Sequence, residues 1–367
     1  MKFSTQAKKI QQALSRAQLM TTRQSSLEVL QGVFIGVTEE GGVVRATNLH
    51  IGIEAKFPGQ VDSVGSCVCD ATLLLGVVGS VAGDETITCE VVETTLHITT
   101  PHSQTTIKLL NAEDFPSLPH IDSSEKISVR SVDLIHGLQS VVYAASASDI
   151  KPQISSVYIY LDDAGSLVCV STDSFRLAEK KIPTISSAAL EGVMVPVKNA
   201  QVLMRVFSDT DEVVDIHFSD SQMTFTTQNY YCVTRLVDGN YPAYQNILPK
   251  EFVAEATFLK SDILTTLKTL NVFADKFYQI DIVVDGEKNI TTLSSHHPER
   301  GNHTAELPCM VEGESLDMRC NARYLQDGLG AITTESVVLK FVATNKPFIV
   351  APVGEYDFQY LVMPLNR

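Results

Sequence analysis

The sequence predicts an α+β protein made of three tandem domains of one fold, each with two helices packed on antiparallel sheets. The first observation is a repeat. Short helices are predicted to begin at Ala71, Val197 and Ala322, which are 126 and 125 residues apart. The second is a longer amphipathic segment earlier in each unit. The third is a set of short β-branched runs between the helices, many of which alternate apolar with polar residues as antiparallel strands do.

Local signals support the elements in chain order. The longer helices are expected at 7–19, 131–145 and 261–273. Asp70 is a candidate N-cap for the helix over 71–80, and Pro196 suits the first turn of the next short helix. Strands are expected at 32–37, 42–46, 86–92, 95–100, 154–161, 167–170, 213–218 and 337–342.

The repeat sets the expected domain boundaries. Pro116 and Pro242 close the first two units and are also 126 residues apart. A period near 125 residues is too long for a solenoid repeat, so it indicates whole domains. The predicted domains are 1–122, 123–248 and 249–367.

Composition limits the class of protein. The 367 residues are 44% hydrophobic and 19% charged, and there is no apolar run long enough to span a membrane. The N-terminus lacks the apolar core of a signal peptide. Seven cysteines, an odd number, indicate free thiols in a reducing compartment, so a cytoplasmic protein is expected. Cys67 and Cys69 have the wrong spacing for a typical zinc or redox pair, and no metal or cofactor is predicted.

The charge pattern points to nucleic acid although the net charge is −15. The first 27 residues carry five basic groups and no acid, and most of the 43 acids are predicted on strands and loops. Basic residues recur on the helices or their starts: Lys8, Lys9, Arg16, Lys198, Arg205, Lys260, Lys268, Arg319 and Arg323. Helices facing one side would attract the phosphate backbone weakly without reading bases. Three such domains cannot readily enclose a duplex, whereas two chains could.

Three segments that are distant in the sequence each combine apolar residues with a turn or a proline. Residues 171–178 combine a turn at Asp173 and Ser174 with the alternating apolar residues Phe175 and Leu177, and with Arg176. Residues 239–249 and 361–365 each mix apolar residues with proline. Segments of this kind can wall a shallow groove that accepts a short peptide.

The same segments resemble the bacterial sliding clamp family, the beta subunit of DNA polymerase III. Ser171–Ala178, Asp238–Pro242 with Ile247–Lys250, Val362–Leu365, Met1–Phe3 and Ala112–Pro116 match its pattern, so the resemblance spans the chain. The chain departs at Ser174 and Phe175, where glycine and histidine or tyrosine are usual, and at Glu28, where proline is usual. The resemblance implies a head-to-tail dimer ring around duplex DNA that tethers the replicative polymerase, the clamp loader and other proteins with a clamp-binding motif.

Site residues follow from the resemblance position by position. It implies a peptide groove formed by Ile154, Thr172, Ser174, Phe175, Arg176, Leu177, Pro242, Ile247, Leu361, Met363 and Pro364. Matched or adjacent DNA-contacting positions are Arg23, Gln24, Lys151, Gln153 and Lys198, to which the basic helix face adds Arg16. The implied dimer contact joins Thr105 and Ile107 to Val272 and Phe273, with threonine where the family often has a large apolar residue.

Other functions are less compatible with the sequence. An enzyme is not predicted, because the chain lacks G-x-S-x-G, a phosphate-binding glycine loop and H-E-x-x-H. Asp173 and Ser174 are better explained as turn formers. His296, His297 and His303 form the densest histidine cluster, in a segment predicted to be a polar loop. A divergent clamp paralogue, or a peptide-binding scaffold outside bulk replication, remains the alternative.

Overall fold

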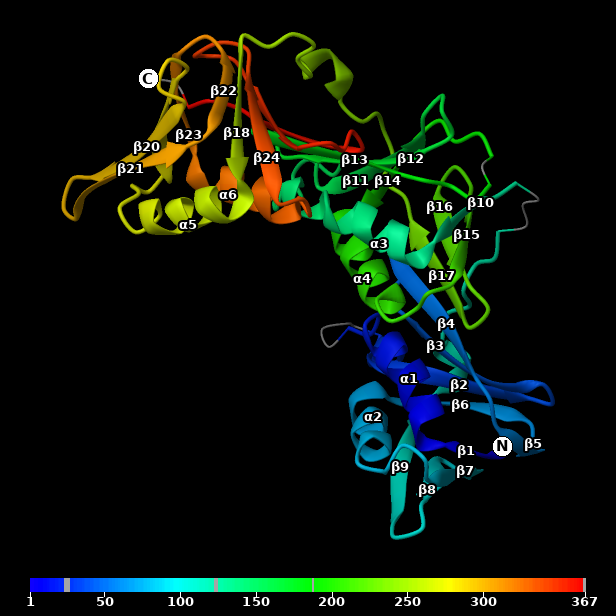
Figure 1. Ribbon diagram of the computed structural model, residues 1–367. Helices are drawn as coiled ribbons and strands as arrows, with labels where there is room; N and C mark the ends of the chain where they lie inside the picture. Colours follow the sequence, from blue (N-terminus) through cyan, green and yellow to red (C-terminus); the bar gives the residue numbers. More distant parts are fainter. Residues whose placement is uncertain (23–26, 122–124, 187, 366–367) are drawn as a thin grey trace. The chain divides into compact units, whose positions relative to one another are not determined.

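The computed structural model describes residues 1–22, 27–121, 125–186 and 188–365. The chain folds into two compact units. Unit 1 consists of Met1–Ile135, Thr184–Ala188 and Lys198–Leu236, and unit 2 consists of His136–Pro183, Ala189–Val197 and Val237–Arg367. Each unit contains its own sheets and helices (Figure 1).

Unit 1 is organised by one antiparallel sheet of 13 strands among the described residues. Alternating burial along strands such as β3 shows that one face of the sheet packs into the core. In sheet order the strands are β10 (Ile127–Arg130), β15 (Val213–Phe218), β16 (Gln222–Thr226), β17 (Tyr230–Arg235), β4 (Ile51–Phe57), β3 (Gly41–Thr47), β2 (Gly32–Thr38), β6 (Gly65–Asp70), β9 (Gln104–Leu110), β8 (Thr95–Thr99), β7 (Thr86–Val92), β1 (Lys2–Gln6) and β5 (Gln60–Ser63).

The helices of unit 1 cover the buried face of this sheet. Helix α1 (Ala7–Gln18) packs on β1, β3 and β4 and lies beside α2 (Ala71–Gly79), as Figure 1 shows. Its buried residues include Ile10, Ala13 and Leu14, the apolar stripe expected from the sequence. The Asp70 carboxylate accepts from the N–H of Leu73 over 2.7 Å, which confirms it as the N-cap of α2. Helix α4 (Val197–Phe207) and the 3₁₀ turns Glu28–Gln31 and Ala112–Asp114 complete the unit.

Unit 2 contains two antiparallel sheets. Among the residues described for this unit, one sheet has nine strands and the other four. The nine are β14 (Val193–Pro196), β11 (Ser156–Leu161), β12 (Leu167–Thr172), β13 (Arg176–Ile182), β26 (Phe358–Val362), β25 (Phe348–Pro352), β24 (Ser336–Phe341), β18 (Ala254–Leu259) and β22 (Met310–Gly313). The four are β21 (Gly301–Pro308), β20 (Ile290–His297), β19 (Gln279–Asp285) and β23 (Leu316–Asn321).

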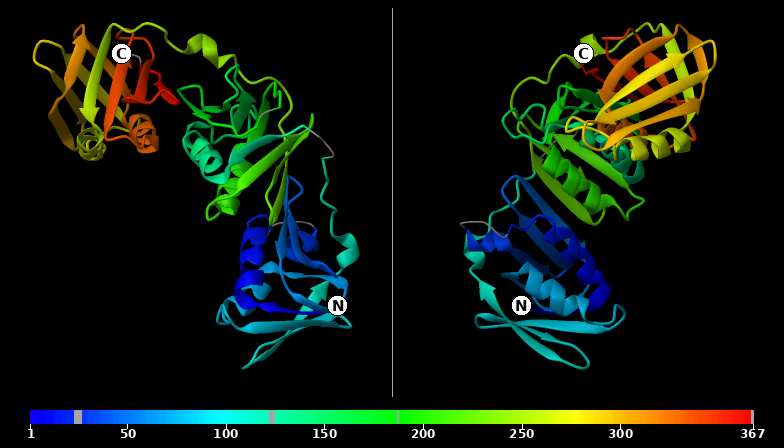
Figure 2. Two further views of the ribbon diagram at one scale, coloured as in Figure 1. Left: turned by 45° about the vertical axis from the view of Figure 1, so that its right-hand side comes forward. Right: turned by 90° about the vertical axis from the view of Figure 1, so that its left-hand side faces the viewer.

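Two neighbouring helices of unit 2 contact both of these sheets. Helix α5 (Lys260–Leu270) packs on β18, β20 and β21, and α6 (Ala322–Ala331) packs on β23, β25 and β26. Figures 1 and 2 show α5 and α6 side by side. Helix α6 passes so close to β26 that a Cβ at Gly328 would lie 2.2 Å from Tyr360 Cδ1. Glycine is therefore required there for the helix to pack. The 3₁₀ turns Val142–Ala144 and Tyr244–Ile247 also belong to unit 2.

The sheets join consecutive repeats. Strand β17 of the middle repeat pairs with β4 of the first, and β26 of the last repeat pairs with β13 of the middle one. The middle repeat therefore contributes strands to both units, which explains why compactness divides the chain in two although the repeat is threefold. The exact boundaries at 122 and 248 stay predictions. The first falls outside the described residues and the second follows the turn Tyr244–Ile247.

The expected helices and strands are confirmed, except for one helix and for the segment around Phe175. The helix predicted over 131–145 ends at Gln139 as α3 (Ser131–Gln139), and only a short 3₁₀ turn follows. Ser140 turns its hydroxyl back to the carbonyl of His136, and the β-branched Val141 adopts φ −125°, which interrupts the helix. Phe175 is not in a strand as its alternation with Leu177 suggested. It belongs to the turn before β13, and its side chain is 58% exposed.

Candidate functional site

A tight turn joins β12 to β13 in unit 2. Thr172 Oγ1 donates to the carbonyl oxygen of Arg176 over 2.6 Å and accepts from the N–H of Ser174 over 3.1 Å. The Asp173 carboxylate accepts from the N–H groups of Phe175 and Arg176 at 2.9 and 3.0 Å. Ser174 adopts φ 79°, the left-handed conformation that favours glycine. These side-chain bonds hold the turn in one shape and leave Ser174 and Phe175 at the surface.

The Arg176 guanidinium is held by partners from three segments. Its Nε donates to Asp173 Oδ2 over 3.0 Å, Nη1 to Asp327 Oδ2 over 2.5 Å, and Nη2 to the carbonyl oxygen of Tyr143 over 2.7 Å. The guanidinium carbon also lies 4.5 Å from the centre of the Tyr324 ring. Each of the three guanidinium nitrogens therefore has an acceptor inside the protein.

The charge of Arg176 is kept despite its burial. Burial alone would lower the pKa of Arg176, but interactions with Tyr360, Asp327 and Asp173 outweigh it and raise the pKa above its usual range. Tyr324 and Asp327 come from helix α6, so Arg176 ties the turn to that helix. Its side chain supports the turn, while the neighbouring Phe175 is free to meet a ligand.

The C-terminal segment lies directly against this turn. Strand β26 pairs with β13 so that Leu361 is opposite Leu177 and Val362 is opposite Arg176. Beyond the strand, the N–H of Met363 donates to the carbonyl oxygen of Phe175 over 2.9 Å, and the N–H of Leu365 donates to the carbonyl oxygen of Arg319. Met363 is 36% exposed and Phe175 58%, so both of these bonded residues lie at the surface.

The segment that follows Gly239 packs on the same sheet. Tyr244 is buried in a cluster with Leu177, Leu361 and Ile349, against which Tyr241 also packs. The Tyr241 ring stacks on Tyr158 with centroids 4.7 Å apart. Pro242 and Ile247 flank Tyr244 and are exposed. The buried tyrosines therefore anchor this segment, and the exposed residues beside them are presented to solvent.

A buried carboxylate anchors Tyr244. Its hydroxyl donates to Glu179 Oε2 in a short hydrogen bond, and it shares a second bond of 2.8 Å with the hydroxyl of Tyr160. Glu179 is only 6% exposed, and its other oxygen accepts from the amide of Gln359 over 2.7 Å. Burial and the neighbouring Glu179 carboxylate raise the pKa of Tyr244, so its hydroxyl stays protonated and can donate.

The structure thus gathers most of the predicted groove residues on one sheet end. Thr172, Leu177 and Leu361 are buried beneath it, whereas Ser174, Phe175, Pro242, Ile247 and Met363 are exposed. Pro364 is partly buried after Met363. Ile154 is partly buried just before β11, and its carbonyl oxygen accepts from the N–H of Ser146. The role of this set in binding stays a prediction.

Sequence reasoning missed several residues that shape this surface. Glu179 directly follows the matched segment Ser171–Ala178, whereas Tyr160 and Asp327 come from segments that carry no recognisable motif. A signal for Glu179 was present, because an acid within a run of buried strand residues needs a partner. The identity of that partner is not visible in the sequence, since Tyr244 lies 65 residues further along.

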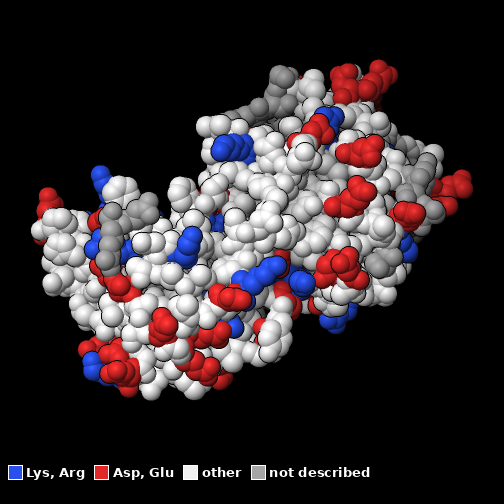
Figure 3. All heavy atoms as spheres, turned by 90° about the horizontal axis from the view of Figure 1, so that it is seen from above, with Lys and Arg blue, Asp and Glu red and all other residues white. Residues whose placement is uncertain are grey.

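The predicted DNA-contacting residues are distributed over both units. Arg16 and Lys198 belong to unit 1, and Lys151 and Gln153 to unit 2. Arg23 and Gln24 lie outside the described residues. The Arg16 side chain is already engaged, since Nε donates to the carbonyl oxygen of Val206 and Nη2 to Asp209. Lys8, Lys9, Lys151 and Lys198 are exposed. Acidic side chains are spread over the face shown in Figure 3, with basic side chains between them.

The predicted dimer residues lie near open strand edges. Thr105 and Ile107 are in β9, which pairs with β8 along Gln104–Lys108 and with β6 only at its end, within the described part of the chain. Val272 and Phe273 follow α5, and Val272 is 59% exposed. The Phe273 ring stacks on His303 of β21, an edge strand of the four-stranded sheet.

The described residues contain no group of three or more metal-ligating side chains close enough to hold an ion. His296, His297 and His303 lie on β20 and β21 in place of the predicted polar loop, and Ser295 is opposite His303. All seven cysteines are free thiols. No described helix is long and apolar enough to cross a lipid bilayer.

Three repeats joined by shared sheets, with paired helices on the sheets, define a DNA clamp fold. Family models for the DNA polymerase III beta subunit match the N-terminal domain at residues 1–119, the central domain at 128–243 and the C-terminal domain at 245–366. The chain belongs to the DNA polymerase III beta subunit family.

Similar proteins cover the whole chain. The beta sliding clamp of Streptococcus pneumoniae is 26% identical over 99% of both chains, and that of Synechococcus elongatus is 27% identical over 88% of this chain and 87% of its own. The crystal structure of the S. pneumoniae beta chain covers 100% of both chains at 26% identity with a TM-score of 0.94. The Bacillus subtilis clamp, 22% identical over 100% of this chain and 99% of its own, has the same fold with a TM-score of 0.94.

Proposed function

We propose that this protein is a DNA polymerase processivity factor, a sliding clamp that encircles duplex DNA and tethers the replicative polymerase. The observation that carries the proposal is the match of all three beta-subunit models, in order, to a chain whose fold is that of known clamps. As a clamp it has no catalytic role. It acts in the cytoplasm on nucleoid DNA as an accessory subunit of the polymerase.

Ring closure would join the β9 end of one protomer to the α5 and β21 end of its partner. An open strand edge presents unpaired N–H and C=O groups that favour pairing with another strand. The stretch of β9 that pairs only with β8, and the edge strand β21, supply such groups. Val272 is 59% exposed and supplies apolar contact area beside Phe273, whereas Ile107 is only 6% exposed and supports β9 from within. Thr105 adds less apolar area than a large aliphatic residue would, so a comparatively labile ring is expected.

Contact with DNA would be electrostatic and independent of sequence. Exposed lysines on helices, such as Lys9 on α1 and Lys198 on α4, can approach phosphates without entering a groove. Arg16 would act indirectly by tying α1 to the end of α4, since its guanidinium is occupied by Val206 and Asp209. Weak backbone contacts of this kind permit sliding.

The polymerase, the clamp loader and other partners would bind through an extended peptide at the β12–β13 turn. Phe175, Ile247 and Met363 are exposed large apolar residues, and Pro242 adds a rigid neighbour. Burial of two or three peptide side chains against them would give a Kd of about 1 μM, or roughly −8 kcal/mol. The defined turn and the anchored Tyr244 segment lower the entropic cost of binding by holding the surface in place.

Loading on circular DNA tests the proposal. The protein is labelled, loaded on nicked circular DNA by a clamp loader with ATP, and separated from free protein by gel filtration before and after the DNA is linearised. Retention on the circle and loss after linearisation are expected, because an encircling protein slides off free ends. A protein retained equally on both forms, or a strictly monomeric one at micromolar concentration, would contradict the ring.

Charge reversal tests the helical DNA contacts. Lys9→Glu with Lys198→Glu should shorten the lifetime on circular DNA and flatten its salt dependence, since each lost phosphate contact reduces the counterions released. Lys288→Glu is the matched control, because Lys288 lies in the β19–β20 turn, where it pairs with Asp285. Equal lifetimes for the double variant and the control would show that these helices do not face the DNA.

A further inference from the structure

Unit 1 contains a second turn with the conformation of the β12–β13 turn. At the end of β3, Thr47 Oγ1 donates to the carbonyl oxygen of Ile51 and accepts from the N–H of Leu49, both over 3.0 Å. Thr172 makes the same two bonds, to Arg176 and Ser174, in unit 2. The central residues adopt the same left-handed conformation, with φ 72° at Leu49 and 79° at Ser174.

The surroundings of the two turns also correspond. Asn48 Oδ1 accepts from the N–H groups of His50 and Ile51 over 3.0 Å, as the Asp173 carboxylate does from the two residues that follow Ser174. The N–H of Arg235 donates to the carbonyl oxygen of His50 over 2.9 Å. This bond corresponds to the one from Met363 to Phe175. His50 therefore occupies the position of Phe175, and Arg235 that of Met363.

A linker also crosses the turn of unit 1, as the segment around Tyr244 does in unit 2. Pro116 and Leu118 lie 126 residues before Pro242 and Tyr244. Leu118 is packed over the backbone of Gly52, where an added Cβ would lie 2.4 Å from Leu118 Cδ2. The linker is held by the Tyr231 hydroxyl, which donates to the carbonyl oxygen of Pro119 over 2.8 Å.

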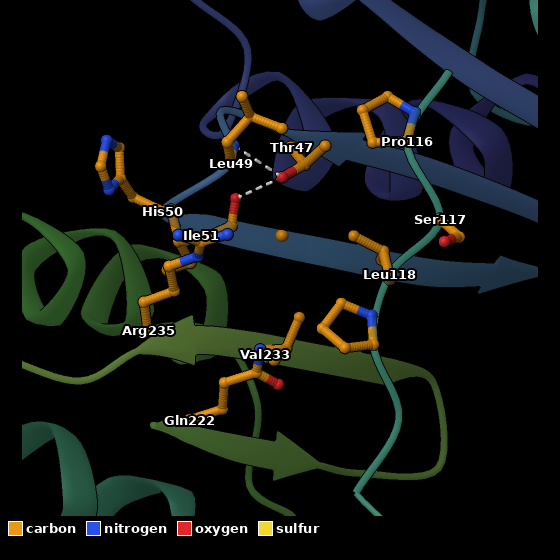
Figure 4. Close-up of a pocket in the computed structure, with 12 residues that line it drawn as sticks. Thr47, Leu49, His50, Ile51, Pro116, Ser117, Leu118, Gln222, Val233 and Arg235 are labelled. Atoms are coloured by element: carbon orange, nitrogen blue, oxygen red, sulfur yellow. Dashed lines mark hydrogen bonds between the residues drawn. The ribbon is translucent and has the colours of Figure 1, made fainter. Parts of the chain in front are cut away.

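Between this linker and the turn lies a cavity of about 90 Å³ (Figure 4). Leu49, Ile51, Leu118 and Val233 give it apolar walls, and Pro116 lies on the linker side. Its volume lies between the ~30 Å³ that one water occupies in the liquid and the ~150 Å³ of a cavity that binds benzene. It therefore suits one small aliphatic side chain and excludes an aromatic ring.

The rim of the cavity differs from the surface around Phe175. His50 and Arg235 line the cavity and are exposed. The Arg235 guanidinium forms no hydrogen bond or ion pair with the residues that the structure describes. The equivalent residues in unit 2, Phe175 and Met363, are apolar. A guanidinium at the rim favours a carboxylate, because hydrogen bonds between charged groups are stronger than neutral ones.

We propose that this cavity is a second peptide-binding site, specific for a small aliphatic side chain next to an acidic residue. The proposal rests on the peptide-binding function of the β12–β13 turn, whose architecture it repeats, but assigns a different ligand. The aliphatic side chain enters between Leu118 and Val233, and the carboxylate pairs with Arg235. With one anchor and one ion pair, a Kd of about 1 mM is expected.

Methyl NMR on the full-length protein tests this site. The protein is labelled at leucine and valine methyl groups and titrated with the capped peptide Gly-Ser-Val-Asp-Gly. The methyl signals of Leu118 and Val233 are expected to shift and saturate. Replacing valine by glycine or aspartate by asparagine in the peptide should raise the Kd at least about fivefold, as should Arg235→Gln in the protein.

Matched variants separate this site from the one in unit 2. His50→Ser should weaken the Gly-Ser-Val-Asp-Gly peptide only, and Phe175→Ser should weaken a clamp-loader peptide only. The second site is contradicted if the Leu118 and Val233 methyl signals do not shift at about 5 mM peptide. It is also contradicted if the Kd obtained from the shifts is unchanged both by Arg235→Gln and by the asparagine peptide. If the affinity of the clamp-loader peptide is unchanged in Phe175→Ser, the proposed peptide-binding function of unit 2 is contradicted instead.

Discussion

The N–H of Met363 donates to the carbonyl oxygen of Phe175 over 2.9 Å, which joins the C-terminal segment to the β12–β13 turn. Residues far apart in the chain thereby border one surface. Neither bonding group belongs to a side chain, so the contact depends on the register of β26 on β13. This register places the backbone of Met363 against that of Phe175.

Deleting residues 363–367 should weaken peptide binding while the fold persists. Val362 remains in place, paired with Arg176 and Phe348, so β26 is intact. The loss of Met363 and Pro364 should raise the Kd of a clamp-loader peptide at least about tenfold, or roughly 1.4 kcal/mol. Fluorescence anisotropy measures the affinity and a thermal melt the fold. Unchanged affinity in a folded truncation would exclude the C-terminus from the site.

Replacing Arg176 should loosen the turn from helix α6. Arg176→Lys retains the charge but cannot reach Asp173, Asp327 and the Tyr143 carbonyl together. We expect the free energy of unfolding to fall by about 2 kcal/mol, since each lost hydrogen bond to a charged group contributes roughly 1.5–3 kcal/mol. A double-mutant cycle with Asp327→Asn in urea denaturation isolates the pair. Additive effects of the two changes would show that the ion pair contributes no coupling.

Glycine at the left-handed turn positions should stabilise the protein. Ser174 and Leu49 both adopt φ near the left-handed region, at 79° and 72°. A left-handed residue other than glycine costs roughly 1–2 kcal/mol, which glycine relieves in part because it adds entropy to the unfolded chain. Ser174→Gly and Leu49→Gly should each raise the free energy of unfolding by about 0.5 kcal/mol, and with it the unfolding midpoint. Gly76→Ala in α2, where a Cβ meets nothing within 4 Å, is a control in a right-handed helix. A lower midpoint for both glycine variants would contradict strain at the turns.

The buried thiols should make stability fall at alkaline pH. Burial raises the pKa of Cys67, Cys89 and Cys169 to about 12. The pKa of these thiols in the folded protein lies above the unfolded value of about 8.5. Their contribution to the free energy of unfolding is therefore fully present below about pH 8.5 and is lost as the pH rises toward about 12. Urea midpoints at pH 7.5 and 9.5 measure the effect, and a variant with alanine at all three positions should show a smaller drop. If the urea midpoint of the variant decreases by the same amount, groups other than these three thiols cause the loss of stability.

Thiol labelling should distinguish one cysteine from the rest. Cys309 is partly exposed, whereas the other six thiols are buried. An aromatic disulfide reagent at pH 8 should therefore label about one thiol per folded chain rapidly, and Cys309→Ser should abolish that fast phase. In urea all seven should react. A fast phase that survives in Cys309→Ser would show that a buried segment opens readily.

Local patterns in the sequence were enough to predict the threefold repeat, the helices with their apolar faces and the turn at 172–176. The N-cap at Asp70 and the apolar stripe of α1 needed no distant information. The resemblance added the family and the approximate surface for peptides. The interruption after Gln139 was missed because the competing bonds of Ser140 and the conformation of Val141 leave only weak local traces.

The contacts between distant side chains could not be predicted in this way, because they depend on how the chain packs. Arg176 bonds to Asp327, 151 residues away, and Tyr244 to Glu179, 65 residues away. The pairing of β17 with β4 and of β26 with β13 arises from strand register between repeats, which no single segment encodes. The cavity beside Leu118 likewise exists because a glycine on one strand lies under a leucine on a distant linker. Such contacts depend on packing in three dimensions, whereas local patterns constrain only neighbours along the chain.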